Sequence, residues 1–126
     1  METTIVAVPS TYPGGLDAPL GAHFGHCDLY TLVEVTGGQM QAVRLLPNVP
    51  HQQGGCMAPV NHLAQNGVRI LIAGGMGMRP LMGFNQVGIN VLHGAGAQTV
   101  GEALKAFLDG KLQQFTSEFT CGGGKA

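Results

Sequence analysis

The stretch that decides the fold is Val68–Pro80, VRILIAGGMGMRP. Its first six residues are apolar apart from Arg69 and rich in β-branched residues, which is typical of a buried strand. A glycine-rich turn follows, and Pro80 predicts the start of a helix because proline is favoured at the first helical position. Glycines let backbone amides approach a bound group, and a helix N-terminus adds partial positive charge. We therefore predict that this turn binds a soft anion. Met76 and Met78 would supply thioethers and Arg79 a fixed positive charge. The predicted site consists of Gly74, Gly75, Met76, Gly77, Met78 and Arg79.

The composition indicates a small globular protein. The chain has 126 residues, of which 44% are hydrophobic and 10% are charged, so one domain can bury a core. The net charge of -1 argues against a general nucleic-acid or acidic-membrane binder, since both need a basic surface. Three cysteines give no disulfide framework, the start lacks the basic residues of a signal peptide, and no apolar run reaches membrane-span length. We expect a cytoplasmic protein.

Three strands are expected before the first helix. Thr3–Val8 is β-branched and alternating, and Pro9 is expected to end it. A long loop, Ser10–Cys27, separates it from a second strand over Leu29–Val35. Gly37–Gly38 predicts a hairpin turn of the kind that needs positive φ, so that Gln39–Leu46 returns as the third strand.

Helices and strands alternate in the second half. The apolar pattern predicts a helix over Cys56–Gln65, a strand over Val68–Ala73, a helix ending at Gly88, and a short strand over Ile89–Leu92. A capping box, Thr99–Glu102, predicts a last helix that Gly110 can end. We expect one domain over residues 1–112 and a mobile tail over 113–126.

The predicted order is βββαβαβα, which gives an α/β fold with a five-stranded mixed sheet flanked by helices. Right-handed crossovers make the later strands parallel, so strands one, three, four and five should end at one edge of the sheet. Ligands of open α/β sheets bind at such an edge. Besides the glycine turn, the topology gathers there the candidate ligand residues His23, His26, Cys27, His51, Cys56, His93 and Gly94.

Five of these residues are candidate metal ligands: His23, His26, Cys27, His51 and Cys56. Thiolates, thioethers and imidazoles suit copper(I) or a metal–sulfur unit, whereas a closed zinc site would need paired CxxC or HxxxH motifs. The alternatives are histidines that hydrogen-bond backbone carbonyls and a Cys56 that is a small buried apolar residue. For the glycine turn, the alternative is that Met76 and Met78 are core residues. A third interpretation is thiol chemistry at Cys56, because a helix N-terminus favours the thiolate and His51 offers a base.

Other motifs do not support competing chemistries. The turn Gly74–Gly77 lacks the full GxGxxG spacing of a dinucleotide site, and the C-terminal GGGKA lacks the Ser or Thr of a phosphate loop. The carboxylates are scattered along the chain, which argues against a nuclease that uses two magnesium ions.

HFGHCDLY (residues 23–30), AGGMGMRP (residues 73–80) and the element order resemble the dinitrogenase iron–molybdenum cofactor biosynthesis family, over about Thr3 to Leu112. The resemblance implies a ribonuclease H-like fold without nuclease chemistry, and non-enzymatic binding of a metal–sulfur cluster or its precursor. The family's HFG falls on His23–Gly25 and its glycine turn on Gly74–Arg79. His26 and Cys27 depart from many relatives, which have a basic residue and alanine there, so Cys27 is either a ligand of this branch or an inert thiol.

Within this family the chain is most similar to members from sulfate-reducing bacteria that carry a molybdenum–copper sulfide cluster. That similarity implies a molybdenum–copper sulfide cofactor, with an iron–molybdenum type as the alternative. It also implies MinD-like P-loop ATPases as partners, while a homodimer stays open. Two competing functions are a metal-free regulatory module for such an ATPase and a small thiol-dependent enzyme.

Overall fold

The elements follow the predicted order. In the computed structural model the described residues are 3–20, 28–48, 57–76, 78–94 and 96–116, and for Met57 and Arg79 the description covers the backbone alone. The elements are β1 (Thr3–Ser10), β2 (Leu29–Thr36), β3 (Gln39–Pro47), α1 (Met57–Gln65), β4 (Val68–Ala73), α2 (Met78–Val87), β5 (Asn90–His93) and α3 (Val100–Leu108). No helix in these ranges is long and apolar enough to cross a membrane.

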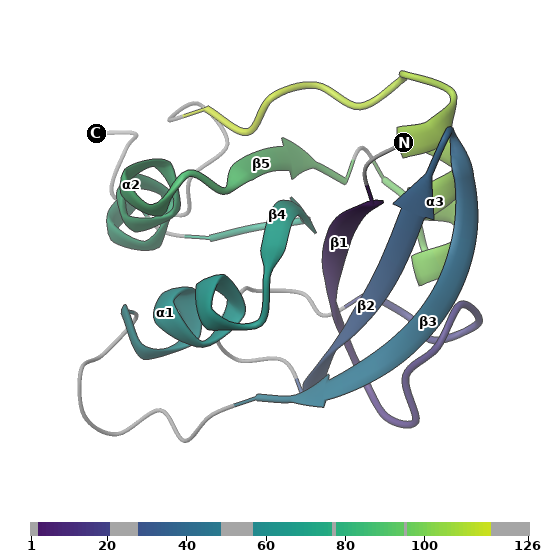
Figure 1. The fold of residues 1–126 in the computed structure, drawn as a ribbon, viewed down its shortest axis with the longest axis horizontal. Coiled ribbons are helices and arrows are strands. Elements are labelled where there is room, and N and C mark those ends of the chain that lie inside the picture. The colour runs from purple at the N-terminus through teal and green to yellow at the C-terminus, as the bar shows by residue number, and fades with distance from the viewer. Residues whose placement is uncertain (1–2, 21–27, 49–56, 77, 95, 117–126) are drawn as a thin grey trace.

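The strands form one mixed sheet in the order β3-β2-β1-β4-β5 (Figure 1). β2 runs antiparallel to β1 and to β3, whereas β4 runs parallel to β1 and to β5. β1, β3, β4 and β5 therefore point the same way, which confirms the predicted five-stranded α/β architecture. Gly37 and Gly38 make the β2–β3 turn with φ of 62° and 81°, values that glycine adopts without steric cost.

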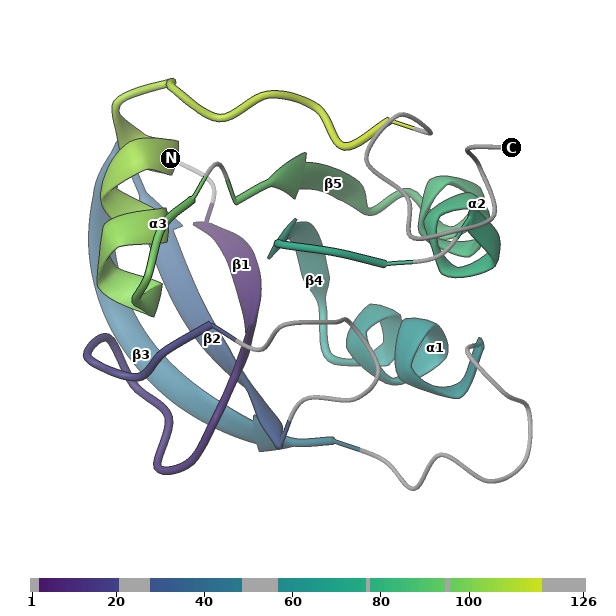
Figure 2. The same ribbon diagram turned by 180° about the vertical axis from the view of Figure 1, so that it is seen from behind.

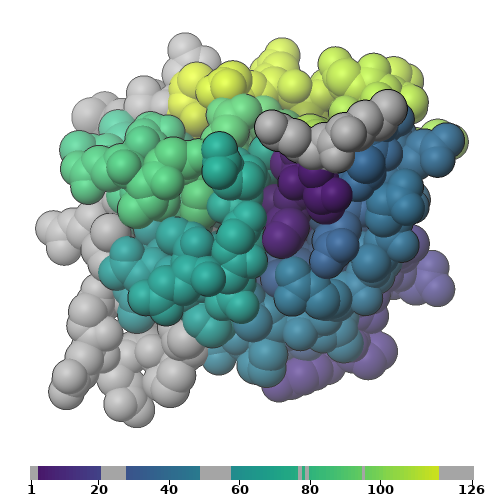
Figure 3. Space-filling model, in the orientation of Figure 1, coloured from purple at the N-terminus to yellow at the C-terminus, as the bar shows by residue number. Residues whose placement is uncertain are grey.

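Helices cover both faces of the sheet, and each face has its own apolar core (Figures 1 and 2). On one face, α1 and α2 pack on β-strand residues such as Leu32 and Leu71 through Leu63 and Phe84. On the other face, α3 packs through Leu104 on the alternate strand residues. The space-filling view shows α1 and α2 lying against each other beside β4 (Figure 3).

Two predicted element ends were wrong. Pro9 does not end β1: it lies opposite Tyr30 of β2, and the strand continues to Ser10. α2 begins at Met78, two residues before Pro80. Pro80 lies in the first turn, where backbone N–H groups have no partner inside the helix, so its missing N–H costs no helical hydrogen bond.

Residues that follow the expected domain boundary at residue 112 pair with β5. The N–H of His93 donates to the carbonyl of Gln113, and the N–H of Phe115 donates to the carbonyl of Val91. Gln114 forms an antiparallel bridge with Leu92, and Phe115 is buried in the core on the α1–α2 face. Residues 113–115 thus cover the outer edge of β5 and belong to the domain, while residues 117–126 of the expected tail lie outside the described residues.

The predicted capping box at α3 is present in a modified form. The side chain of Thr99 accepts a hydrogen bond from the N–H of Glu102 at 3.2 Å, and Glu102 Oε1 accepts from the N–H of Gln98 at 3.0 Å. The first bond satisfies a backbone donor that the helix leaves free at its start, and the second fixes the residue before the cap.

Replacing Thr99 by alanine removes the cap and should lower the free energy of unfolding by about 1 kcal/mol. Urea denaturation followed by circular dichroism measures this change. Thr99→Ser keeps the hydroxyl acceptor and is the matched control, so it should retain most of the stability. A Thr99→Ala protein as stable as Thr99→Ser would contradict the assignment of the cap.

Candidate functional site

Four strands end at the same edge of the sheet. Since β1, β3, β4 and β5 are co-directional, their last residues Ser10, Pro47, Ala73 and His93 lie toward this edge. The N–H of Gly94 donates to the carbonyl of Ala73 at 2.9 Å, which joins the end of β5 to the end of β4. We call this edge the carboxyl edge. It is the place where open α/β sheets bind ligands.

A buried chain of hydroxyl groups fixes the loop after β1. Ser10 Oγ donates to the carbonyl of Val8 at 2.8 Å and lies 2.9 Å from Thr31 Oγ1, which also accepts from the N–H of Gly15 at 3.1 Å. Because Ser10 has a single hydroxyl proton, the hydroxyl of Thr31 must donate to Ser10 Oγ. Ser10 and Thr31 are fully buried, so this chain holds Gly15 to the sheet from inside the core. Sequence reasoning missed it, although two small polar residues in apolar strands were a visible signal.

The next part of this loop is bound to the segment that follows β5. The N–H of Leu20 donates to the carbonyl of Gln98, and the N–H of Val100 donates to the carbonyl of Ala18. Gly101 also donates to the carbonyl of Leu16 at 2.7 Å. The loops after β1 and β5 are therefore one connected structure at the carboxyl edge.

The residues on either side of HFGHC are both fixed in place. Leu20 is held to Gln98, and the N–H of Asp28 donates to the carbonyl of Ser10 at 3.2 Å. The carboxylate of Asp28 accepts from the N–H of Tyr12 at 3.1 Å. Leu20 and Asp28, the described residues nearest to the candidate ligands in the chain, thus lie near the ends of β1 and β5.

The glycine turn after β4 divides into a buried and an exposed part. Gly74 is exposed, whereas Gly75 is buried and Met76 is 1% exposed in the α1–α2 core. For Met76 the structure agrees with the alternative of a core residue and not with the prediction that its thioether lines the cradle. Met78 begins α2 and is 39% exposed, so its thioether is accessible from solvent. The backbone of Arg79 lies in the first turn of α2, and Gly77 lies outside the described residues.

His93 and Gly94 lie where they were expected, at the end of β5. The His93 ring packs on Phe115 with a centroid separation of 5.7 Å and an interplanar angle of 42°, and its side chain is half-buried. Gly94 is buried beside Leu20, whose Cδ2 would lie 3.4 Å from a Cβ added at Gly94. This is an ordinary van der Waals distance, so Gly94 lies in direct packing contact with the loop after β1.

The five candidate metal ligands His23, His26, Cys27, His51 and Cys56 lie outside the described residues. α1 begins at Met57, so Cys56 directly precedes a helix in the chain. Within the ranges that the structure describes, no group of three or more His, Cys, Asp or Glu residues is placed to hold a metal ion. The assignment of these ligands stays a prediction.

A shallow hollow lies at the opposite edge of the sheet. It has a volume of about 570 Å³ and is lined by the starts of β1 and β4 and by the glycines that follow α1 and α2, including Thr3, Ile5, Gly67, Arg69 and Gly88. No pattern in the sequence indicated this hollow. Its position at the amino ends of β1 and β4 separates it from the candidate ligands.

The sequence profile of the dinitrogenase iron-molybdenum cofactor family matches residues 4–110. The chain belongs to this family. The chain is also similar to an uncharacterized protein of Methanocaldococcus jannaschii. The two are 30% identical over 98 residues, which are 76% of this chain and 82% of that protein. The family assignment therefore extends over the sheet, the three helices and both edges described above.

Solved structures agree with the assignment. A Thermotoga protein provisionally named NifB is 26% identical, with a TM-score of 0.71 over 90% of this chain and 97% of that chain. The apo form of the orange protein from Desulfovibrio gigas is 24% identical, with a TM-score of 0.77 over 90% and 93% of the two chains. At this identity the likeness to the orange protein shows a shared fold. It confirms the predicted fold class.

Proposed function

We propose that this protein binds and carries an anionic metal–sulfur cluster at the carboxyl edge and that it does so without catalysing a reaction. The observation that carries the proposal is the convergence of the loops after β1, β4 and β5 at that edge in a member of a cofactor family. The preferred cargo is a molybdenum–copper sulfide cluster, and an iron–molybdenum precursor is the alternative.

The chemistry of the edge suits such a cargo. Sulfides of a thiomolybdate carry negative charge, and the first turn of α2 offers free backbone N–H groups together with the partial positive charge of the helix. The exposed Gly74 leaves space for close approach of the backbone, and the exposed thioether of Met78 is a soft, sulfur-compatible contact. These groups can hold a cluster by charge-assisted hydrogen bonds, so ligation by Cys27 or Cys56 is an addition and not a requirement.

Metal analysis with a visible absorption spectrum tests this proposal. The protein is purified anaerobically from its native source, and the recombinant protein is mixed with tetrathiomolybdate and copper(I). Charge-transfer bands with stoichiometric molybdenum are the expected result, and the ratio of copper to iron distinguishes the two cargo types. A colourless, metal-free native protein that also resists reconstitution would overturn the proposal and favour a regulatory module for an ATPase.

Replacing Arg79 by alanine should weaken cluster uptake about tenfold, because one charge-assisted hydrogen bond contributes about 1.5–3 kcal/mol and tenfold corresponds to about 1.4 kcal/mol. Absorption titration of the reconstituted protein measures the change. Arg69→Ala is the matched control, since Arg69 is an exposed arginine that lines the hollow at the opposite edge. Equal uptake by the two variants would remove Arg79 from the site.

Two further parts of the proposal rest on the family resemblance and the cysteine count. We infer MinD-like P-loop ATPases as partners and the cytoplasm as the location. Co-purification of a tagged chain with a P-loop ATPase from the native cytoplasmic fraction supports both. Recovery of the chain in another compartment would contradict the second.

A further inference from the structure

The two outermost strands of the sheet, β5 and β3, differ in whether their outer sides are paired. The outer edge of β5 is paired with residues 113–115 through the bonds of His93 and Phe115. β3 has no strand on its outer side among the described residues (Figure 1), and every residue of β3 except the half-buried Leu46 is exposed. An open edge strand presents unpaired backbone groups that can pair with another strand.

β3 has an irregularity near its start, where the register with β2 shifts at Gln41, but few other features that protect an edge strand. Its one proline, Pro47, is its last residue, and its one charged residue is Arg44. The register with β2 places Met40 opposite Val35, Val43 opposite Val33 and Leu45 opposite Thr31. Partners opposite each other share a face, and Val33 and Val35 belong to the α3-side core, so the exposed apolar side chains of β3 lie on the α3 face. The regular part of β3 after Gln41, which carries Val43 and Leu45, is therefore suited to pairing with another strand.

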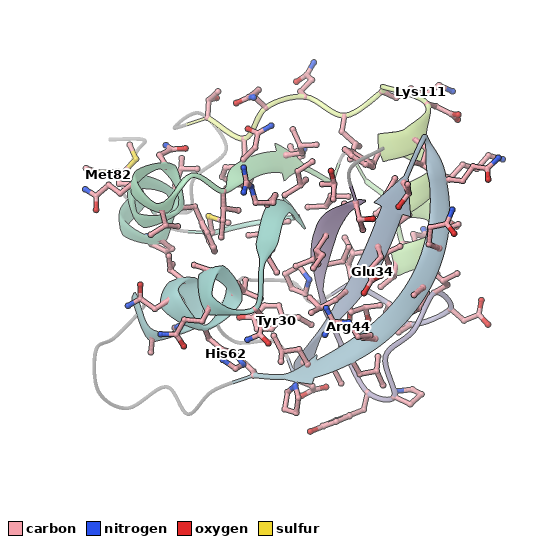
Figure 4. The ribbon with its side chains drawn as sticks, viewed as in Figure 1. Tyr30, Glu34, Arg44, His62, Met82 and Lys111 are labelled. Carbon is pink, nitrogen blue, oxygen red and sulfur yellow. The ribbon has the colours of Figure 1, made fainter. Side chains whose placement is uncertain are left out.

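The charges of β2 and β3 lie on the opposite face. Arg44 pairs with Leu32 and Ala42 pairs with Glu34, and Leu32 belongs to the α1–α2 core. Arg44 Nε lies 3.4 Å from Glu34 Oε2, and Figure 4 shows the two side chains side by side. One strand edge thus combines an apolar row on one face with a single ion pair on the other.

We propose that β3 pairs antiparallel with β3 of a second copy of this chain, with the twofold axis at Val43, so that the two sheets become one continuous sheet. A twofold axis normal to the sheet makes identical strands antiparallel, so the interface needs only this one segment. At this register Val43 faces Val43 of the other copy, and Arg44 faces Ala42 of the other copy. The interface is independent of the proposed cluster site, which lies at the carboxyl edge.

Charge complementarity favours a second copy of this chain as the partner of β3, and it sets the register in which the two β3 strands pair. Ala42 of the other copy is paired with that copy's Glu34, so Arg44 and that Glu34 lie in one row across neighbouring strands. Strands lie about 4.8 Å apart, which puts their Cα atoms roughly 10 Å apart, within reach of two long side chains. Each Arg44 is then flanked by two glutamates, its own and that of the other copy. An axis at Arg44 would instead place the two arginines directly opposite each other.

Light scattering coupled to size-exclusion chromatography tests the pairing on the full chain over a range of concentrations. We expect a concentration-dependent dimer, and at least a tenfold higher dimer dissociation constant for Val43→Lys, which places two ammonium groups at the axis. Val87→Lys on α2 is the matched control, because Val87 is 40% exposed and Val43 is 42% exposed. A monomer at every concentration, or a dimer that Val43→Lys does not weaken, would overturn the proposal.

A charge-reversal pair tests the register and also serves if Val43→Lys does not fold. Arg44→Glu and Glu34→Arg each place like charges along the row, so each should weaken the dimer, and the double variant R44E/E34R should restore it. Hydrogen exchange of the β3 amides should become slower as the fraction of dimer rises. A double variant as weak as the single ones, or β3 amides whose exchange is the same in monomer and dimer, would refute the β3 interface.

Discussion

Replacing Phe84 by alanine should lower the free energy of unfolding by about 3–5 kcal/mol, a large fraction of the 5–15 kcal/mol that stabilises a typical domain. The Phe84 side chain is fully buried in the α1–α2 core, in the same cluster as Met76 and Leu81. The loss combines transfer of the ring to water with the cavity that remains, because a packed core collapses only in part. Urea denaturation measures it.

The control for Phe84→Ala lies on the same helix. Met82 is two residues away on α2, and its side chain is 54% exposed and points away from the sheet in Figure 4. Met82→Ala should change the stability by no more than about 0.5 kcal/mol, as expected for surface sites. Similar losses for the two variants would contradict the assignment of the inner face of α2.

The fold could be predicted from the sequence because its strongest signals are local. Val68–Ala73 is an apolar run, broken only by the exposed Arg69, between a helix-ending Gly67 and a glycine turn, and the structure places β4 over the same residues. Gly37 and Gly38 define the β2–β3 hairpin without any tertiary information. The handedness of crossovers then leaves few ways to join the later strands.

Tertiary contacts decided the features that the sequence did not predict. Pro9 is tolerated in β1 although proline usually ends a strand, and the sheet continues through it. Residues 113–115 have no strand-like pattern of their own, but the open edge of β5 gives their backbone groups partners. Met76 follows a glycine pair that suggested a surface turn, yet its side chain fills the core beneath α2.

The sequence predicted where the candidate site lies on the sheet, but it did not predict the hydrogen bonds that hold its loops. Topology alone brings the ends of β1, β3, β4 and β5 to one edge, and the structure confirms this direction for all four strands. The bonds that tie Leu16–Leu20 to Gln98–Gly101 could not be inferred, because they join loops that are about 80 residues apart and have no periodic pattern. Sequence reasoning therefore located the edge but not the way in which it is held together.

Replacing Thr31 by valine should lower the free energy of unfolding by about 1–3 kcal/mol, because a buried group that loses its partner keeps its desolvation cost. Valine has nearly the shape of threonine but neither donates to Ser10 Oγ nor accepts from the N–H of Gly15. The loss of stability should be largest in the loop after β1, so the amide hydrogen of Gly15 should exchange with solvent much faster than the amide hydrogens of β1. Hydrogen exchange with urea denaturation measures both effects.

Thr31→Ser separates the hydroxyl from the methyl group, because serine keeps the chain of hydroxyls and loses only a methyl. It should retain slow exchange at Gly15 even if the core is slightly loosened. The same two variants test whether the loop takes part in cluster binding. If the loop carries the cluster ligands, the Thr31→Val protein should bind less cluster on reconstitution than the Thr31→Ser protein. Equal reconstitution with a faster-exchanging loop would mean that the cluster is held by the glycine turn and α2, and that the loop contributes to the fold alone.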